Sequence, residues 1–343
     1  MSMNPISLFN RLIILIFLSA SAATAGPGTR SVLAYYENDS GASSSALRSR
    51  FTSFNQLAFD TYPVNSQGIV SGDTFTGDID FALTQKIQVF ATVSNFDSAG
   101  FDASVAHSLI TSSADTERFI AGILKQLEAA HYSGVNIDFE SVAPSDRAAF
   151  TAFISTLAQA MHKAGYLIII SVPAELKDDP TDSWRGAYDF RVLGSLIDVL
   201  QLMTYDEYGT WSNPGPVAGL DWVEASLKYT LSVVPSAKVS LGIPAYGYDW
   251  DVTNAANNTQ IPWAAVGPLL AKTKATPQWD ATYSSPYFFY SLKGHQHVVW
   301  YENPRSITLK SSLVTTYNLA GVSVYCLGME APAFWQAIHA GGF

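Results

Sequence analysis

The sequence is poor in cysteine and in charged residues, and each shortage narrows the range of functions. Cys326 is the single cysteine in 343 residues, so an intrachain disulfide is excluded and stability must come from the core. Charged residues make up only 14% of the chain, and the 29 acidic residues outnumber the 19 basic ones. The net charge of −10 argues against nucleic acid as a partner and against electrostatic docking on an anionic membrane.

Long apolar runs are also scarce, and the run at the N-terminus is too short to span a bilayer as a helix. Leu12–Leu18 follows Arg11, the only charge of this segment, and precedes small residues that end in Ala23-Thr24-Ala25. This order is typical of a secretory signal peptide, here residues 1–25; the alternative is a retained N-terminal anchor. We therefore expect an exported protein, secreted or periplasmic, whose mature chain has no membrane contact.

The chain is instead rich in apolar and aromatic residues. Hydrophobic residues make up 48% of it, including 17 Tyr, 19 Phe and 8 Trp. A chain of about 300 residues with this composition can bury a large core. Exported proteins that are rich in aromatic residues and poor in charge often bind sugars, because the C–H faces of sugars stack on aromatic rings.

Strand-like and helix-like segments alternate along the chain. One helical pattern covers 116–130, with Asp115 as the expected N-cap, and another begins at Pro144 and ends before Gly165. Eight buried strands in βα alternation predict an α/β fold, a TIM (β/α)8 barrel. An open doubly wound sheet is the weaker alternative, since no G-x-G-x-x-G follows the first strand. The eight segments are 31–36, 56–60, 88–94, 134–140, 167–172, 199–205, 238–244 and 321–328.

The stretch 246–300, after the seventh strand, does not follow the alternation of strands and helices. It is long, aromatic and rich in turns, so we expect a small α+β insertion there, within one domain that covers 26–343. His295 and His297 form an H-x-H pair inside it, but no further ligands stand at a suitable spacing. We therefore predict no metal site.

The fourth strand, Gly134–Glu140, carries the candidate chemistry. Apolar and polar residues alternate in it, so Asn136, Asp138 and Glu140 share one face. In a central strand that face must line an interior or a cleft. Two carboxylates about 6–7 Å apart along such a strand raise at least one pKa, which leaves a protonated general acid near neutral pH. The plainer alternative is an exposed strand end.

A barrel places chemistry at the C-terminal ends of its strands, and several polar residues end or follow the predicted strands. Side chains that are scattered in the sequence would therefore converge on one mouth. Two acids, several tyrosines and an amide at that mouth fit carbohydrate chemistry. The residues concerned are Asp60, Asn95, Glu140, Tyr205, Asp206, Tyr246, Tyr248 and Tyr325.

At these positions the sequence resembles glycoside hydrolase family 18, the chitinase-type hydrolases. The family's fourth-strand signature D-x-x-D-x-D-x-E corresponds to 133–140, where both last acids match and Ser133 and Asn136 replace the first two. The sixth-strand signature M-x-Y-D corresponds to Met203–Asp206. The segments 202–209, 214–218 and 242–250 are most similar to the branch with the bacterial spore-cortex lytic N-acetylglucosaminidases.

The resemblance implies a retaining hydrolysis in which the substrate assists. Glu140 would protonate the glycosidic oxygen, while the 2-acetamido group of the sugar would attack and close to an oxazolinium ion, held by Asp138 and Tyr205. The substrate would be a β-1,4-linked N-acetylglucosamine glycan, in chitin oligomers or peptidoglycan. We expect a monomer without a cofactor. The residues expected to bind the sugar are Asp206, Asn136, Met203, Tyr246, Tyr248, Tyr325, Trp211, Tyr36 and Asn95.

Some expectations concern the departures from the family pattern. Asn136 is expected to hydrogen-bond Asp138 and, by removing a negative neighbour, to make Asp138 easier to ionise than in relatives with a third acid. Tyr325 is expected at the place where many members carry a tryptophan floor under the reacting sugar. For Trp211 and the two insert tyrosines, plain packing is the alternative. Two other functions also stay open, a sugar-binding lectin on an inactive barrel and a barrel whose mouth binds protein.

Overall fold

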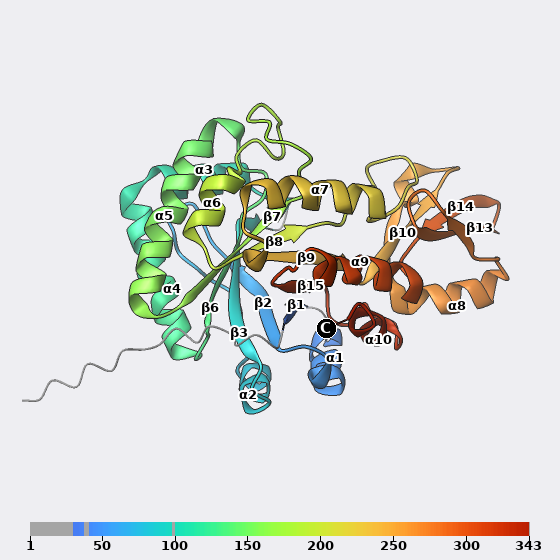
Figure 1. The fold of residues 1–343 in the computed structure, drawn as a ribbon, viewed down its shortest axis with the longest axis horizontal. Helices are drawn as coiled ribbons and strands as arrows, with labels where there is room; N and C mark the ends of the chain where they lie inside the picture. Colours follow the sequence, from blue (N-terminus) through green and yellow to red (C-terminus); the bar gives the residue numbers. More distant parts are fainter. Residues whose placement is uncertain (1–29, 38–40, 98–99, 343) are drawn as a thin grey trace, which may run out of the picture.

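The computed structural model describes residues 30–37, 41–97 and 100–342. Its main part is a barrel of parallel strands surrounded by helices (Figure 1). Residues 1–25, for which a signal peptide is predicted, lie outside the described residues. Within the described ranges, every helix is too short or too polar to cross a bilayer.

Eight parallel strands close the barrel in the order β1-β15-β9-β8-β7-β6-β3-β2. This confirms the predicted TIM barrel. Most residues of these strands are buried, because one face packs inside the barrel and the other packs against the helices. The strands are β1 (Ser31–Glu37), β2 (Gln56–Pro63), β3 (Gln88–Ser94), β6 (Gly134–Asp138), β7 (Leu167–Pro173), β8 (Val199–Met203), β9 (Val239–Pro244) and β15 (Gly321–Tyr325).

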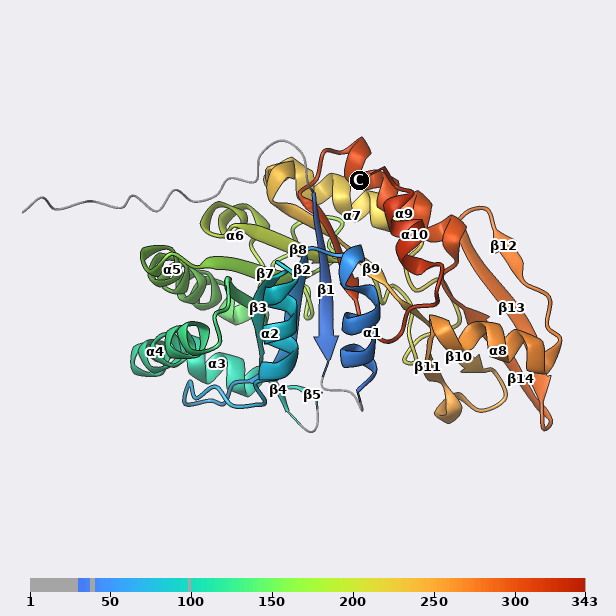
Figure 2. The same ribbon diagram turned by 90° about the horizontal axis from the view of Figure 1, so that it is seen from below.

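The helices cover the outside of the barrel, as Figure 2 shows from below. The predicted cap of α4 was wrong by three residues: Ser112 accepts from the backbone N–H of Asp115, which lies in the first turn. Gly165 ends α5 with a φ of +84°, as predicted for a C-terminal glycine. The helices are α1 (Ala42–Arg50), α2 (Thr76–Thr84), α3 (Ala103–Thr111), α4 (Ser113–Ala129), α5 (Arg147–Ala164), α6 (Phe190–Leu196), α7 (Leu220–Val233), α9 (Pro304–Thr316) and α10 (Phe334–His339).

The insertion after β9 forms a separate antiparallel sheet beside the barrel, visible in both views (Figures 1 and 2). The strand order is β11-β10-β14-β13-β12, and helix α8 packs on the sheet, so the predicted α+β insertion is present. The elements are β10 (Tyr246–Asp251), β11 (Thr259–Pro262), α8 (Trp263–Thr273), β12 (Gln278–Asp280), β13 (Ser285–Leu292) and β14 (His295–Trp300).

The H-x-H pair of the insertion joins two strands of its sheet. Nδ1 of His295 lies 2.6 Å from Oδ2 of Asp251, and Nδ1 of His297 lies 2.9 Å from Oδ1 of Asp249. Both aspartates belong to β10, the neighbouring strand. Each histidine ring is therefore paired with an aspartate of the neighbouring strand. Among the described residues, no group of three or more His, Cys, Asp or Glu side chains could hold a metal ion.

Candidate active site

A cavity of about 1430 Å³ lies at the C-terminal ends of the barrel strands. Its lining includes most of the residues that the sequence placed at the mouth. Asp138 comes from the end of β6, Met203 from the end of β8 and Tyr325 from the end of β15. The other predicted members in the lining are Asp60, Glu140, Tyr205, Asp206 and Trp211.

Strand β6 presents two carboxyl groups to this cavity. All five residues of β6 are buried, and Asp138 at its end is only 8% exposed. Oδ1 of Asp138 has no hydrogen-bond partner among the described residues. Glu140 follows two residues later, on the same face of the chain, and it also lines the cavity. One buried carboxyl oxygen is therefore available to a ligand next to a second carboxyl group.

Both carboxyl groups resist ionisation. Burial raises the pKa of Asp138 well above its ordinary value, and the nearby carboxylates of Glu140 and Glu37 raise it further. Burial, followed by the charges of Asp206 and Asp60, raises the pKa of Glu140 to about 8. Glu140 is therefore largely protonated near neutral pH, which is the state that a general acid needs.

Two tyrosines from neighbouring parts of the mouth stack beside these acids. The rings of Tyr205 and Tyr325 lie 5.8 Å apart with an angle of 26° between their planes. Burial raises the pKa of the Tyr205 phenol, and the charges of Asp138, Glu140 and Asp206 add to that increase. Tyr205 is therefore a neutral hydrogen-bond donor within electrostatic reach of all three acids.

The matched signatures and this geometry agree with a comparison against known protein families. Residues 34–330 match the family described as glycosyl hydrolases family 18. The chain belongs to glycosyl hydrolases family 18. The signatures on β6 and after β8 therefore lie at the mouth of a family 18 barrel, with their acids and their tyrosine in one cavity. The catalytic roles of the individual residues stay predictions.

Three relatives indicate how similar this family 18 chain is to known proteins. It is 37% identical over 339 residues to an uncharacterized glycosylase, YvbX, of Bacillus subtilis, covering 98% of this chain and 97% of the relative. It is 28% identical over 258 residues to the cortical fragment-lytic enzyme of B. subtilis, covering 74% of this chain and 59% of the relative. A chitinase structure from Chromobacterium violaceum superposes with a TM-score of 0.86 at 40% identity, covering 91% and 99% of the two chains.

Asn95 lies behind the family 18 signature rather than in the cavity. It is 1% exposed, and its Oδ1 accepts from the backbone N–H of Glu140 at 2.9 Å. Its Nδ2 donates to the carbonyl oxygens of Glu140 (2.8 Å) and Asp102 (2.9 Å). We predicted that Asn95 binds sugar. Its amide oxygen and nitrogen instead form hydrogen bonds with the backbone of Glu140 and Asp102, and these bonds hold Glu140 in place.

Asn136 also lies away from the position that we expected. Its Nδ2 donates to the hydroxyl oxygens of Tyr35 (3.0 Å), Ser171 (3.2 Å) and Thr92 (3.3 Å) in the barrel interior. The expected hydrogen bond to Asp138 does not occur among the described residues, because residues two apart on one strand face stand too far apart. Asn136 is fully buried and does not line the cavity, so a direct contact with sugar is not supported.

The ionisation of Asp138 also differs from the simple expectation. The comparison with relatives that carry a third acid at position 136 stays a prediction. In this chain burial raises the pKa of Asp138, and the carboxylates of Glu140 and of Glu37 on β1 raise it further. The like charges on Asp138 thus come from Glu140, two residues away in the same segment, and from Glu37 on another strand of the barrel.

Asp206 is held by Tyr246 and Tyr248, the two insert tyrosines that we expected to bind the sugar. Its Oδ1 accepts from the hydroxyl of Tyr246 at 2.7 Å and from that of Tyr248 at 2.8 Å. Tyr246 is fully buried and Tyr248 is 4% exposed, and neither lines the cavity. Their burial and their hydrogen bonds give both tyrosines a supporting role behind the lining residue Asp206, so direct sugar stacking by either is not supported.

On β1 the wrong one of two adjacent tyrosines was chosen. The hydroxyl of Tyr36 donates to Oδ2 of Asp78 on α2 at 2.6 Å, and its ring packs on Phe59 and Phe75 outside the barrel. Its neighbour Tyr35 points inward and lines the cavity. Sequence alone could not decide between them, because both faces of β1 are buried.

Trp211 is placed where a sugar-stacking residue would be useful. Its side chain is 69% exposed and lines the cavity. The edge of its ring packs against Tyr248, with centroids 6.0 Å apart. A Cβ atom at position 209 would meet the Trp211 ring at 2.4 Å, so Gly209 makes room for it. Trp211 is therefore a supported, solvent-facing aromatic surface.

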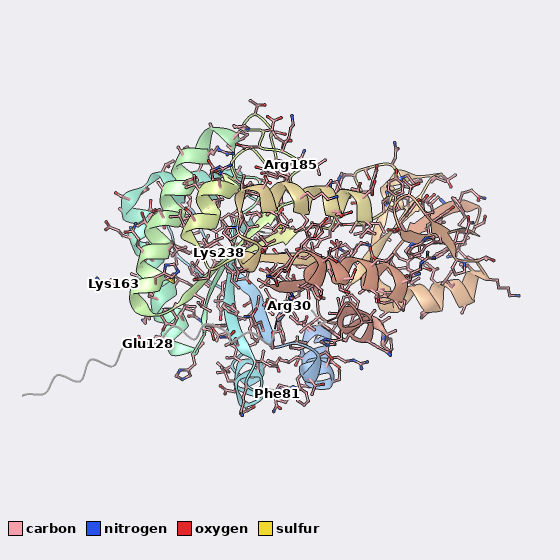
Figure 3. The ribbon with its side chains drawn as sticks, in the orientation of Figure 1. Arg30, Phe81, Glu128, Lys163, Arg185 and Lys238 are labelled. Atoms are coloured by element: carbon pink, nitrogen blue, oxygen red, sulfur yellow. The ribbon has the colours of Figure 1, made fainter. Side chains whose placement is uncertain are left out.

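Several cavity residues were not singled out from the sequence. Glu37 ends β1 and is the register partner of Asp60 on β2. Glu207 follows Asp206, and burial raises its pKa to about 7. Trp184 and Arg185 come from the loop between β7 and α6; Figure 3 labels Arg185 on this loop. The rule that strand ends meet at the mouth would have found Glu37, but nothing local marks the loop residues.

The loop between β7 and α6 carries a buried carboxyl group, that of Glu175. It is 2% exposed, and neither carboxyl oxygen has a hydrogen-bond partner among the described residues. Burial raises its pKa to about 8; nearby Asp178 adds to the shift, whereas Arg147 and Arg185 oppose it. Because the folded state binds the proton more tightly than the unfolded state, this group favours folding at low pH. That contribution is lost as the pH rises through about 8.

Glu175→Gln should therefore weaken the pH dependence of stability. We expect the difference in unfolding free energy between pH 5 and pH 9 to shrink by about 2–4 kcal/mol, since one pKa unit corresponds to about 1.4 kcal/mol. Urea denaturation at both pH values measures this difference. Any loss of stability that the amide itself causes is the same at both pH values and therefore cancels. Glu117→Gln, at an exposed position on α4, is the control. If the difference in the Glu175 variant equalled that of the wild type, the pKa of Glu175 would have to be the same in the folded and the unfolded state.

Proposed function

We propose that this protein is an exported, retaining glycoside hydrolase that cleaves β-1,4-linked N-acetylglucosamine glycans with assistance from the substrate. The observation that carries the proposal is the convergence of Asp138, Glu140 and Tyr205 on one cavity. The raised pKa of Glu140, about 8, supports its role as the proton donor.

The positions of the three residues match a division of roles. Glu140 protonates the glycosidic oxygen as the bond to the leaving sugar breaks. The carbonyl oxygen of the 2-acetamido group attacks the anomeric carbon from the other side and forms the oxazolinium ion. Asp138, with its unpartnered Oδ1, accepts from the acetamide N–H, and the Tyr205 hydroxyl donates to the acetamide oxygen. Water, deprotonated by Glu140, then opens the ring with overall retention.

The rim of the cavity supports a polymeric sugar as the substrate. Phe96, Trp184 and Trp211 are 49%, 43% and 69% exposed, and all three line the cavity. Exposed aromatic side chains that gather around one cavity offer flat faces on which the C–H faces of sugars can stack. The C. violaceum relative is named a chitinase and the B. subtilis relative a cortical fragment-lytic enzyme, which fits N-acetylglucosamine glycans as the substrate class.

Export rests on the N-terminal sequence alone. Residues 1–25 have the charge, apolar run and small-residue ending of a signal peptide. A mass for the exported protein that begins at Gly26 would support this assignment, whereas a mass that includes residues 1–25 would contradict it.

The decisive experiment compares two glycosides that differ only at carbon two. The 2-acetamido substrate should be hydrolysed at least about 100-fold faster than its 2-hydroxy analogue, because only the former contains the intramolecular nucleophile. Mass analysis of products from chitin oligomers and peptidoglycan measures turnover, and a thiazoline mimic of the oxazolinium ion should inhibit. Equal rates for the two glycosides would overturn the mechanism. Binding of the oligomers without any cleavage would favour the alternative of a lectin.

A further inference from the structure

The position of the Glu140 carboxyl group depends on the backbone that carries it. Within the described ranges, no hydrogen bond joins this carboxyl group to the rest of the protein, whereas the backbone N–H and carbonyl of Glu140 are both bonded to Asn95. Glu140 also lies two residues beyond the end of β6, outside the regular pairing of that strand. The direction in which the carboxyl group points is therefore set by whatever fixes residues 139–141.

The chain turns sharply directly after Glu140. Ser141 has a φ of +55°, in the left-handed region that residues with a side chain seldom adopt. Such a conformation persists only where the surrounding structure holds it in place. The segment that leads into this turn therefore needs contacts of its own.

Tyr188, from the loop between β7 and α6, supplies one of these contacts. Its hydroxyl donates to the carbonyl oxygen of Phe139 at 2.6 Å, and both side chains are fully buried. Burial, together with the charges of Glu140 and Asp138, raises the pKa of the phenol, so it stays a neutral donor close to both acids. Tyr188 does not line the cavity, and a sugar bound there does not touch it.

Helix α5 holds Tyr188 and Phe139 together. The ring of Tyr188 packs edge-on against Phe150, with centroids 5.5 Å apart and an angle of 83°. Phe150 and Phe153 stack on the ring of Phe139 at 6.5 and 5.7 Å. Nη1 of Arg147, the first residue of α5, donates to the carbonyl oxygen of Tyr188 at 3.2 Å. One helix thus supports both partners of the hydrogen bond that precedes Glu140.

We propose that Tyr188 is a positioning residue for the proton donor: with Asn95, it fixes the backbone at residues 139–140 so that the Glu140 carboxyl group points at the glycosidic oxygen. This inference rests on the proposed function and adds to it a residue that never meets the substrate. Without the Tyr188 hydroxyl, the buried carbonyl of Phe139 loses a donor, which favours a rearrangement of the segment. A displacement of about 1 Å can slow the reaction about 100-fold.

The test uses two substrates that differ in their need for a proton donor, the N-acetylglucosamine trimer and the dinitrophenyl glycoside of the dimer. A sugar leaves only when it is protonated, whereas dinitrophenolate is a stable anion and leaves without a proton. Tyr188→Phe removes only the hydroxyl. We expect kcat/KM to fall about 10–100-fold for the trimer and less than about threefold for the dinitrophenyl glycoside. The Kd of the trimer, measured by calorimetry, should change less than about twofold, because the cavity lining is unchanged.

The pH profile distinguishes the position of Glu140 from its ionisation. On the trimer, Tyr188→Phe should keep the alkaline decline of wild-type kcat/KM, because burial and the charges of Asp206 and Asp60, which raise the pKa of Glu140, remain. Glu128→Gln changes an exposed carboxyl group on α4, at the opposite end of the barrel (Figure 3), and should match the wild type throughout.

Two further variants make the test specific. Asn95→Ser removes the contacts on the other side of the segment and should show the same dependence on the leaving group as Tyr188→Phe. Tyr290→Phe is the matched control, since it also removes the hydroxyl of a buried tyrosine, here one that donates to Asp249 in the insertion. Tyr290→Phe should hydrolyse both substrates at the wild-type rates.

The outcomes separate this inference from the proposed function. Wild-type kcat/KM on the trimer in Tyr188→Phe would overturn the positioning role. Equal losses on the two substrates would also overturn it, because a smaller folded fraction lowers both rates alike. A displaced alkaline decline would mean that Tyr188 acts on the pKa of Glu140 and not on its position. Failure of the wild type to cleave either substrate would instead overturn the proposed function.

Discussion

Glu140→Gln should reduce kcat on N-acetylglucosamine oligomers by about 10²–10⁴-fold, the range that general acid catalysis typically contributes. The amide keeps the size of the side chain and leaves the backbone bonds to Asn95 in place, at 2.9 and 2.8 Å. KM should therefore change little, and binding of the oligomer should persist. Steady-state kinetics together with calorimetric binding measure the two effects separately.

The dependence of wild-type kcat/KM on pH tests the same role of Glu140 as proton donor. The protonated form of Glu140 is the active acid and its pKa is raised to about 8, so kcat/KM should fall as the pH rises above about 8. The residual activity of Glu140→Gln should lack this alkaline decline, whereas the control Glu128→Gln should keep it. If Glu140→Gln retained wild-type turnover, Glu140 could not be the proton donor.

Lys310→Met should lower the free energy of unfolding by about 3–5 kcal/mol, the cost of leaving a buried charge without its partner. Nζ of Lys310 lies 2.9 Å from both carboxyl oxygens of Glu302, and the two side chains are 0% and 1% exposed. Ser306 also donates to this carboxylate. Glu302 follows β14, the last strand of the insertion, and Lys310 lies on α9 against the barrel, so the pair joins these two parts.

A double variant and a surface pair make this second test specific. Lys310→Met combined with Glu302→Leu should recover most of the stability, since apolar side chains often replace a buried ion pair without loss. Lys228→Met removes a pair with Glu224 whose side chains are 61% and 36% exposed, and it should cost only about 0–1 kcal/mol. Urea denaturation measures all three. Equal losses in the single and double variants would mean that packing, and not the unpaired charge, causes the effect.

The barrel and the central acids could be predicted from the sequence because their signals are local. Parallel strands of a barrel read as continuous apolar runs, and all eight appear within a few residues of the predicted bounds. The period of two on Gly134–Glu140 put Asp138 and Glu140 on one face, and the strand-end rule put them at the mouth. Both signals lie in neighbouring residues and in a general property of the barrel fold.

The parts of the site that sequence did not predict depend on contacts between distant elements. The insert tyrosines Tyr246 and Tyr248 hold Asp206 because β10 leaves the barrel in a direction that no local pattern encodes. Asn95, which follows β3, reaches the backbone of Glu140 at the end of the neighbouring strand β6. On β1, alternation separates Tyr35 from Tyr36 but does not say which of them faces inward, because both faces of the strand are buried.

The order of residues alone thus determined which side chains could donate a proton and at which end of the barrel they stand. Their ionisation was decided only by the tertiary structure. The pKa of Glu140 depends on burial and on the charges of Asp206 and Asp60, which lie more than 65 positions away in the chain. The pKa of Asp138 depends on burial, on nearby Glu140 and on Glu37, which is distant in the chain. Electrostatic energies depend on distance through space and on exposure to water, and folding sets both for residues that the sequence keeps far apart.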